Sequence, residues 1–126
     1  MLSISDVEFE KLIALAMDEL PQKYIQGLNN VLIVFEDEPT EIQRQKAKLR
    51  HNQMLLGLYE GIPRTSRTNN YTMVLPDKIT LFKMAILRNS PDAAALADNI
   101  KRTLWHEIAH HYGLDHNNIH QLEGDT

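Results

Sequence analysis

The sequence contains no cysteine among its 126 residues. This excludes a disulfide framework and any metal site built on thiolate ligands. The absence is compatible with a reducing compartment. Long apolar runs are absent as well, since no stretch approaches the roughly 20 residues that a membrane-spanning helix requires. We therefore expect no membrane partner.

Excess basic charge is also lacking, because 13 Lys and Arg residues face 17 Asp and Glu residues and give a formal net charge of −4. A mildly acidic chain lacks the basic surface typical of a nucleic-acid binder, so no nucleic-acid partner is expected. The densest basic run, residues 44–50, is interpreted as a solvated helix face. Asp6, Glu8 and Glu10 follow the N-terminus closely, so no secretory signal is predicted and a cytoplasmic protein is expected.

The remaining composition is that of an ordinary folded domain, with 43% hydrophobic and 24% charged residues. No internal repeat, low-complexity tract or linker divides the chain, so one domain is predicted over residues 1–126. A domain of this length buries roughly two-thirds of the surface that its unfolded chain exposes. Its core is therefore not expected to depend on a bound metal.

The hydrophobic pattern predicts a mixture of helices and strands. Apolar residues recur at helical spacing from Phe9 to Leu20, with Ser3 or Ser5 as the cap and Pro21 as the stop. A β-branched run at residues 31–35 predicts a buried strand. The other expected segments are a polar helix at 41–53, strands at 55–60, 71–75 and the first half of 79–87, a loop at 64–70, and helical turns at 117–123.

A long helix is predicted near the end of the chain. Residues 89–92 combine a cap residue, a proline and an acidic residue, which is a helix-start signal. Apolar residues then continue at helical spacing to about Tyr112, and Gly113 is the natural stop.

This helix carries the most informative motif of the sequence, the run from His106 to His116. Residues four apart on a helix are offset by about 40° around the axis and about 6 Å along it. His106 and His110 therefore present two imidazoles to one point, as a zinc ion with bonds of about 2.0–2.1 Å requires. Glu107 can flank the metal without binding it and can take a proton from the attacking water. The spacing predicts a zinc site with Glu107 as its catalytic residue.

A third ligand is expected directly after the helix. Gly113 tolerates the left-handed conformation with which a chain turns back. His116 follows three residues later and can complete a three-histidine site, which leaves the fourth position to water. Chance rarely places all five of these residues at this spacing: His106, Glu107, His110, Gly113 and His116. Metal binding is therefore predicted, and not a set of unrelated histidines on an exposed helix.

The other histidines are interpreted differently. His111 points about 100° away from its neighbour His110, so core packing or hydrogen bonding near the site is predicted for it. His51 and His120 are interpreted as exposed side chains. Asp115 and Glu123 are candidates for holding a ligand imidazole by its other N–H group.

At five positions the chain resembles the extended motif H-E-x-x-H-x-x-G-x-x-H of metzincin peptidases: His106, Glu107, His110, Gly113 and His116. The methionine-containing turn of metzincins is not matched, since ten residues follow His116 and none is methionine.

Over nearly its full length the chain is more similar to a family of small bacterial zincin-like proteins, the minimal metallopeptidases. The shared segments are the acidic helix Asp6–Leu20, the strand end Glu36–Pro39, Leu55–Gly61, Leu75–Leu81 and His106–His111. In that family the third ligand is often aspartate, so Asp115 is the alternative to His116.

The resemblance implies a small zincin-like α+β domain, with a short mixed sheet packed against an N-terminal helix and a C-terminal active-site helix. It also implies a Zn²⁺ cofactor and a peptide or protein substrate. We therefore predict a zinc metallopeptidase in which Glu107 is the general base and His106, His110 and His116 bind the metal. An extended substrate could pair with an open strand edge near Ile79. Tyr71 and Tyr112 are candidates for stabilising the oxyanion.

Two alternatives compete with this prediction. The first is a zinc-binding module without turnover, because so small a domain has little room for a substrate cleft. The second is an RNA-processing endonuclease, since residues 106–116 also resemble the pattern H-x-x-x-H-x-x-G-x-D-H of a bacterial ribonuclease family. That family has glycine where this chain has Glu107, and the acidic net charge disfavours RNA binding.

Overall fold

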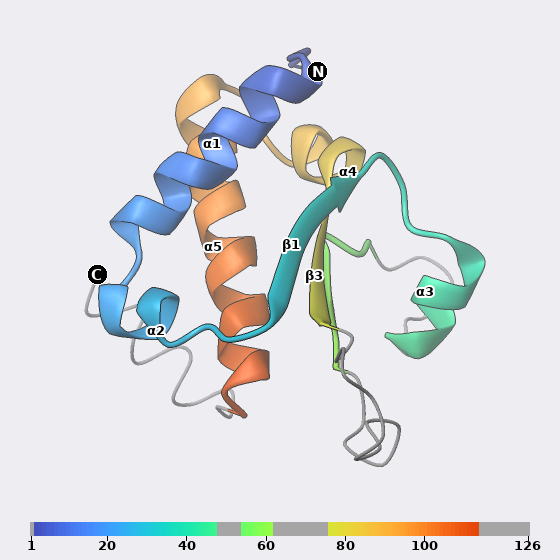
Figure 1. Cartoon of the computed structure of the whole chain (residues 1–126). Coiled ribbons are helices and arrows are strands. Elements are labelled where there is room, and N and C mark those ends of the chain that lie inside the picture. Colours follow the sequence, from blue (N-terminus) through green and yellow to red (C-terminus); the bar gives the residue numbers. More distant parts are fainter. Residues whose placement is uncertain (1, 48–53, 62–75, 114–126) are drawn as a thin grey trace.

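The computed structural model describes residues 2–47, 54–61 and 76–113 (Figure 1). Along these ranges the elements follow in the order α1 (Asp6–Glu19), α2 (Gln22–Gln26), β1 (Val31–Glu36), α3 (Glu41–Lys46), β2 (Gly57–Glu60), β3 (Asp77–Phe82), α4 (Lys83–Arg88) and α5 (Ala93–His111). The loop, strand and helical turns predicted at 64–70, 71–75 and 117–123 lie outside the described residues.

The three strands form a mixed sheet in the order β1-β3-β2. β1 pairs parallel with β3, with Val31 opposite Asp77. β2 pairs antiparallel with β3, with Gly57 opposite Leu81. β3 is thus central, and the predicted open edge near Ile79 is wrong. β3 pairs with β1 on one side and with β2 on the other, so β1 and β2 are the outer strands of the sheet that the structure describes. Of these two, β2 is the strand that packs against the long helix α5.

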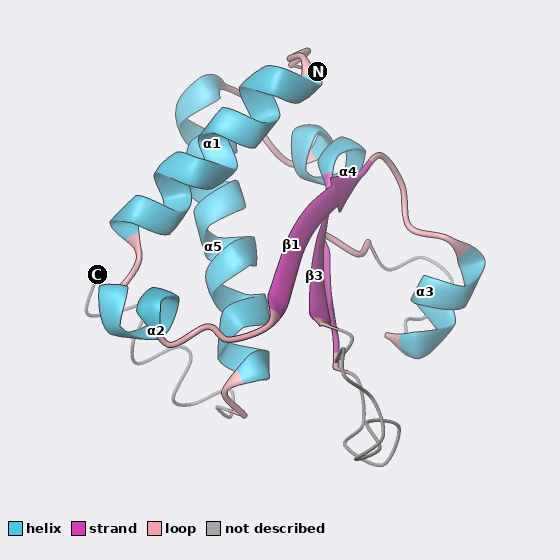
Figure 2. Ribbon diagram, viewed as in Figure 1, coloured by secondary structure: helices cyan, strands magenta, loops and turns pink. Residues whose placement is uncertain are grey.

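Helices lie on both sides of this sheet. In Figure 2, α1 and α5 lie on one side and α3 on the other. Ile79 and Leu81 of β3 are fully buried in the main core with α1 and α5, whereas Phe82 belongs to a smaller cluster with Leu55 and Ala85. Successive side chains of a strand point to opposite faces, which explains the two clusters. The predicted α+β class is therefore confirmed.

The two long helices form as their sequences predict. In α1 the Ser5 hydroxyl accepts a hydrogen bond from the Glu8 amide (3.1 Å), so the second of the two predicted caps is the one used. In α5 the residues that face the core recur every four positions and are at most 2% exposed: Leu96, Ile100, Leu104 and Ile108. This stripe packs α5 firmly against α1 and the sheet, and so fixes the helix that carries the motif.

The start of α5 differs from the prediction by a few residues. Its cap is Asp92, whose carboxylate accepts a hydrogen bond from the Ala95 amide (2.8 Å). Ser90 instead donates from its hydroxyl to the carbonyl of Ile86 (2.7 Å). The proline therefore precedes the helix, because Asp92 offers the acceptor that the exposed amides of the first turn require.

Three short helical segments were predicted incompletely or missed. α3 begins with a capping box between Thr40 and Gln43 but ends at Lys46, well before residue 53. α2 is a single turn after Pro21. α4 directly follows β3, and most of its residues are buried, so its sequence carries no polar face to mark a helical period. None of the helices among the described residues has the length and apolar character needed to cross a membrane.

Candidate metal centre

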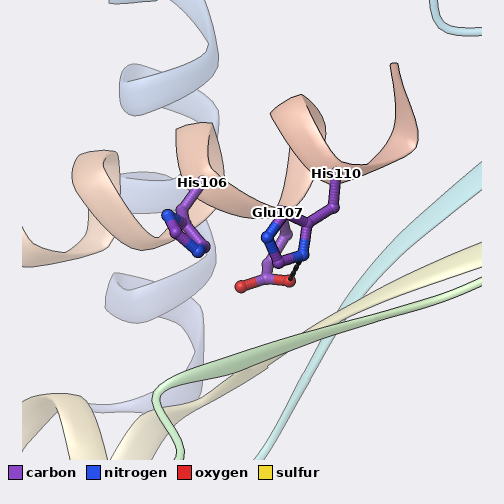
Figure 3. A group of neighbouring side chains, drawn as sticks. All are labelled: His106, Glu107 and His110. Carbon is purple, nitrogen blue, oxygen red and sulfur yellow. Dashed lines mark ion pairs between the residues drawn. The ribbon is translucent and has the colours of Figure 1, made fainter. Parts of the chain in front are cut away.

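The last turns of α5 bring His106, Glu107 and His110 together (Figure 3). One possible ligand atom from each residue lies within 4.8 Å of the other two. The two imidazole rings are 4.6 Å apart between centroids. Two nitrogens bound to one zinc ion lie at most about 4 Å apart, so the imidazoles need only small rotations to bind it. The residues present therefore fit a zinc ion.

Glu107 is the buried member of this group, with 6% of its surface exposed. Its carboxylate oxygen lies 3.5 Å from Nδ1 of His110. Burial raises the pKa of the Glu107 carboxyl to about 7, and a hydrogen bond from the Tyr59 backbone opposes this rise. A carboxyl group with a pKa near neutrality can both accept and release a proton under physiological conditions.

Strand β2 lies directly against this part of α5, and Gly57 makes the close approach feasible. A Cβ atom at position 57 would lie 2.7 Å from Cγ2 of Thr103 and 3.3 Å from Cγ of Glu107. A larger residue would push the strand and the helix apart. No sequence pattern connects Gly57 with Glu107, because they meet only through the tertiary fold.

Replacing Gly57 with alanine is expected to lower the free energy of unfolding by about 1–3 kcal/mol, the usual cost of overpacking. Urea denaturation of the purified proteins measures this change. On a Thr103→Ser background, which lacks the crowded methyl group, the loss should fall by about half or more. An equal loss on both backgrounds would contradict the proposed crowding.

The raised pKa of Glu107 predicts a pH dependence of the metal-free protein. Between the ordinary value of 4.5 and the folded value of about 7, the folded state holds the proton more tightly than the unfolded state. Stability should therefore fall as pH rises through this window, by about 3 kcal/mol at most. Glu107→Gln carries no titrating proton and should lack this decline. Chemical denaturation of both chelated proteins from pH 5 to pH 8 measures the difference, and parallel curves would refute it.

A groove of about 300 Å³ opens beside the three-residue cluster. One wall is formed by Gly57, the first residue of β2, and by Leu56 just before it. The other wall is formed by residues of α5: Arg102, Thr103, His106 and Glu107. This volume accommodates one amino-acid side chain. Arg102 and Thr103 were not predicted from the sequence, and only their position one turn before His106 and Glu107 could have indicated them.

The helix ends as predicted, since Gly113 adopts a φ of +72° directly after its C-cap. Tyr112, a candidate for stabilising the oxyanion, instead donates from its hydroxyl to the Tyr24 carbonyl (2.6 Å). That hydroxyl hydrogen is already used, which argues against the candidate role. The remaining residues singled out from the sequence lie outside the described ranges: His51, Tyr71, Asp115, His116, His120 and Glu123.

The fold and the His-Glu-His arrangement together define a zincin-type protein. A family model described as zincin-like metallopeptidase matches residues 28–125, and the chain belongs to this family. The fold is also similar to that of a conserved hypothetical protein from Thermus thermophilus, with a TM-score of 0.56 and 19% sequence identity over 86% of this chain and 94% of that one. No curated protein gives a match.

Proposed function

We propose that this protein is a zinc-dependent metallopeptidase. The observation that carries the proposal is the position of Glu107, which is buried between two converging histidines and beside β2, one of the two outer strands of the described sheet. His106 and His110 would hold the metal, and His116 would be the third ligand, with Asp115 as its alternative. This arrangement suits hydrolysis by an activated water molecule.

Zinc, when bound at such a site, lowers the pKa of water and polarises a carbonyl group. Glu107 would accept the proton of the attacking water at its carboxylate and then donate it to the leaving amine. The groove wall formed by Leu56 and Thr103 would limit access of other water molecules to the reacting carbonyl.

The edge of β2 offers a binding surface for an extended peptide. The Phe82 amide donates to the Leu56 carbonyl (2.9 Å), so alternate residues of this segment pair with β3. The backbone groups of Gly57 and Tyr59 consequently face away from β3, and the Tyr59 backbone is hydrogen-bonded to the Glu107 carboxylate. Gly57, which also lines the groove, would therefore pair with the peptide. A peptide lying along this edge would pass the three-residue cluster, with one side chain in the groove.

The test compares zinc-loaded and chelated protein on a broad library of peptides. We expect one zinc ion per chain by elemental analysis, and cleavage that stops with the chelator and resumes with added zinc. Zinc binding without any cleavage would instead favour the alternative of a zinc-binding module without turnover. Cleavage that survives complete removal of the metal would refute the proposal.

A further inference from the structure

A second polar cluster, which consists of Tyr59, Asp77 and His111, lies beside the candidate metal centre. The Tyr59 hydroxyl donates to the Asp77 carboxylate (2.9 Å). Nδ1 of His111 lies 3.3 Å from the same hydroxyl and 3.4 Å from the same carboxylate oxygen. The side chains of His111 and Asp77 are only 17% and 13% exposed. The cluster thus joins β2, β3 and the last turn of α5 where water is largely excluded.

Two neighbouring features hold the Tyr59 ring in this position. The ring packs edge-on against the His111 imidazole, with centroids 5.6 Å apart. A Cβ atom at position 61 would lie 2.9 Å from the Tyr59 hydroxyl, so Gly61 leaves just enough room for it. The ring therefore occupies a closely fitting site between the sheet and the helix end.

Tyr59 contacts the candidate metal centre through its other end. Its backbone donates a hydrogen bond to the Glu107 carboxylate. Its side chain holds His111, the residue next to His110. One residue of the edge strand is therefore linked to the proton-accepting group and to the helical turn that presents a histidine.

We propose that Tyr59 is a positioning residue of the metal centre, and that its hydroxyl, held by Asp77 and His111, aligns the edge of β2 and the last turn of α5. This inference rests on the zinc site proposed above. Without the hydroxyl, β2 and the last turn of α5 would lose their link through the Tyr59 side chain, and the backbone bond to Glu107 would remain. His110 would then spend less time in the geometry that binds zinc, and Glu107 would be held less firmly beside it.

The test is Tyr59→Phe, which keeps the ring and the backbone amide and removes only the hydroxyl. We expect zinc affinity, measured by competition with a chromophoric chelator, to fall by about 3- to 10-fold, less than for a direct partner of a ligand. Hydrogen exchange of the residue-59 amide in the metal-free protein should accelerate several-fold. Gly61→Ala, which displaces the same hydroxyl, should act in the same direction.

Two further variants separate positioning from general stability. Lys46→Met removes an ion pair to Glu60 (2.7 Å) on the opposite face of β2, and its zinc affinity should stay within about twofold of the parent. Asp77→Asn keeps an oxygen that accepts from Tyr59, and it should retain more affinity than Asp77→Ala. If Tyr59→Phe lowered only the melting temperature, or lowered zinc affinity no more than Lys46→Met, the inference would be wrong. Since zinc affinity is measured without a substrate, its result stands apart from any failure to cleave peptides.

Discussion

Replacing Glu107 with alanine is expected to lower kcat/KM for peptide hydrolysis by about 10²- to 10⁴-fold, the usual contribution of a positioned acid–base group. The protein should still bind one zinc ion, because the two histidines of α5 and the third ligand remain. The loss should appear mainly in kcat, since the carboxylate acts on protons rather than on substrate binding. Steady-state kinetics with a peptide from the library, together with elemental analysis, measure both quantities.

The matched control is Glu60→Ala on the neighbouring strand. Glu60 carries the same carboxylate, but it pairs with Lys46 on the face of the sheet opposite α5. Its removal should leave kcat/KM within about twofold of the parent. Full activity of zinc-loaded Glu107→Ala would show that another group moves the proton, and the mechanism proposed for Glu107 would have to be abandoned.

Replacing His110 with alanine is expected to abolish stoichiometric zinc binding and peptide cleavage together. Loss of one of three ligands leaves a site that cannot hold the ion at ordinary free zinc concentrations. The fold should persist, because His110 is exposed and the core stripe of α5 is untouched. Zinc content after dialysis and circular dichroism of the same sample test the two statements.

His51→Ala is the matched control, since this histidine lies far outside the motif in the sequence. It should retain one zinc ion per chain. The same assay on His116→Ala and Asp115→Ala identifies the third ligand, because only the true ligand should reproduce the loss seen with His110→Ala. Retention of zinc at full stoichiometry by His110→Ala would exclude His110 as a ligand.

The parts of the site that the sequence predicted depend on local geometry. A helical repeat places His106, Glu107 and His110 near one point whatever surrounds the helix, and Gly113 ends that helix through its own backbone freedom. The strand 31–35 and the helix to Leu20 were likewise predictable, because each has a clear hydrophobic period and turn residues at its ends.

The parts that the sequence did not predict depend on tertiary packing. Gly57 and Tyr59 approach Glu107 only because β2 pairs with a strand some 20 residues further along the chain. The order β1-β3-β2 follows from a crossover that no residue pattern specifies, and for that reason the edge was assigned to the wrong strand. α4 escaped prediction since its apolar residues are buried on nearly all sides.

The buried stripe of α5 also bears on how the metal enters the protein. The same 19-residue helix supplies core side chains and two of the candidate ligands, so half of the proposed coordination shell would be built by folding alone. Small zinc domains without such a core fold only as they capture the ion. At the proposed site, zinc would leave and return while the chain stays folded, and its supply would set how much of an already folded population is active.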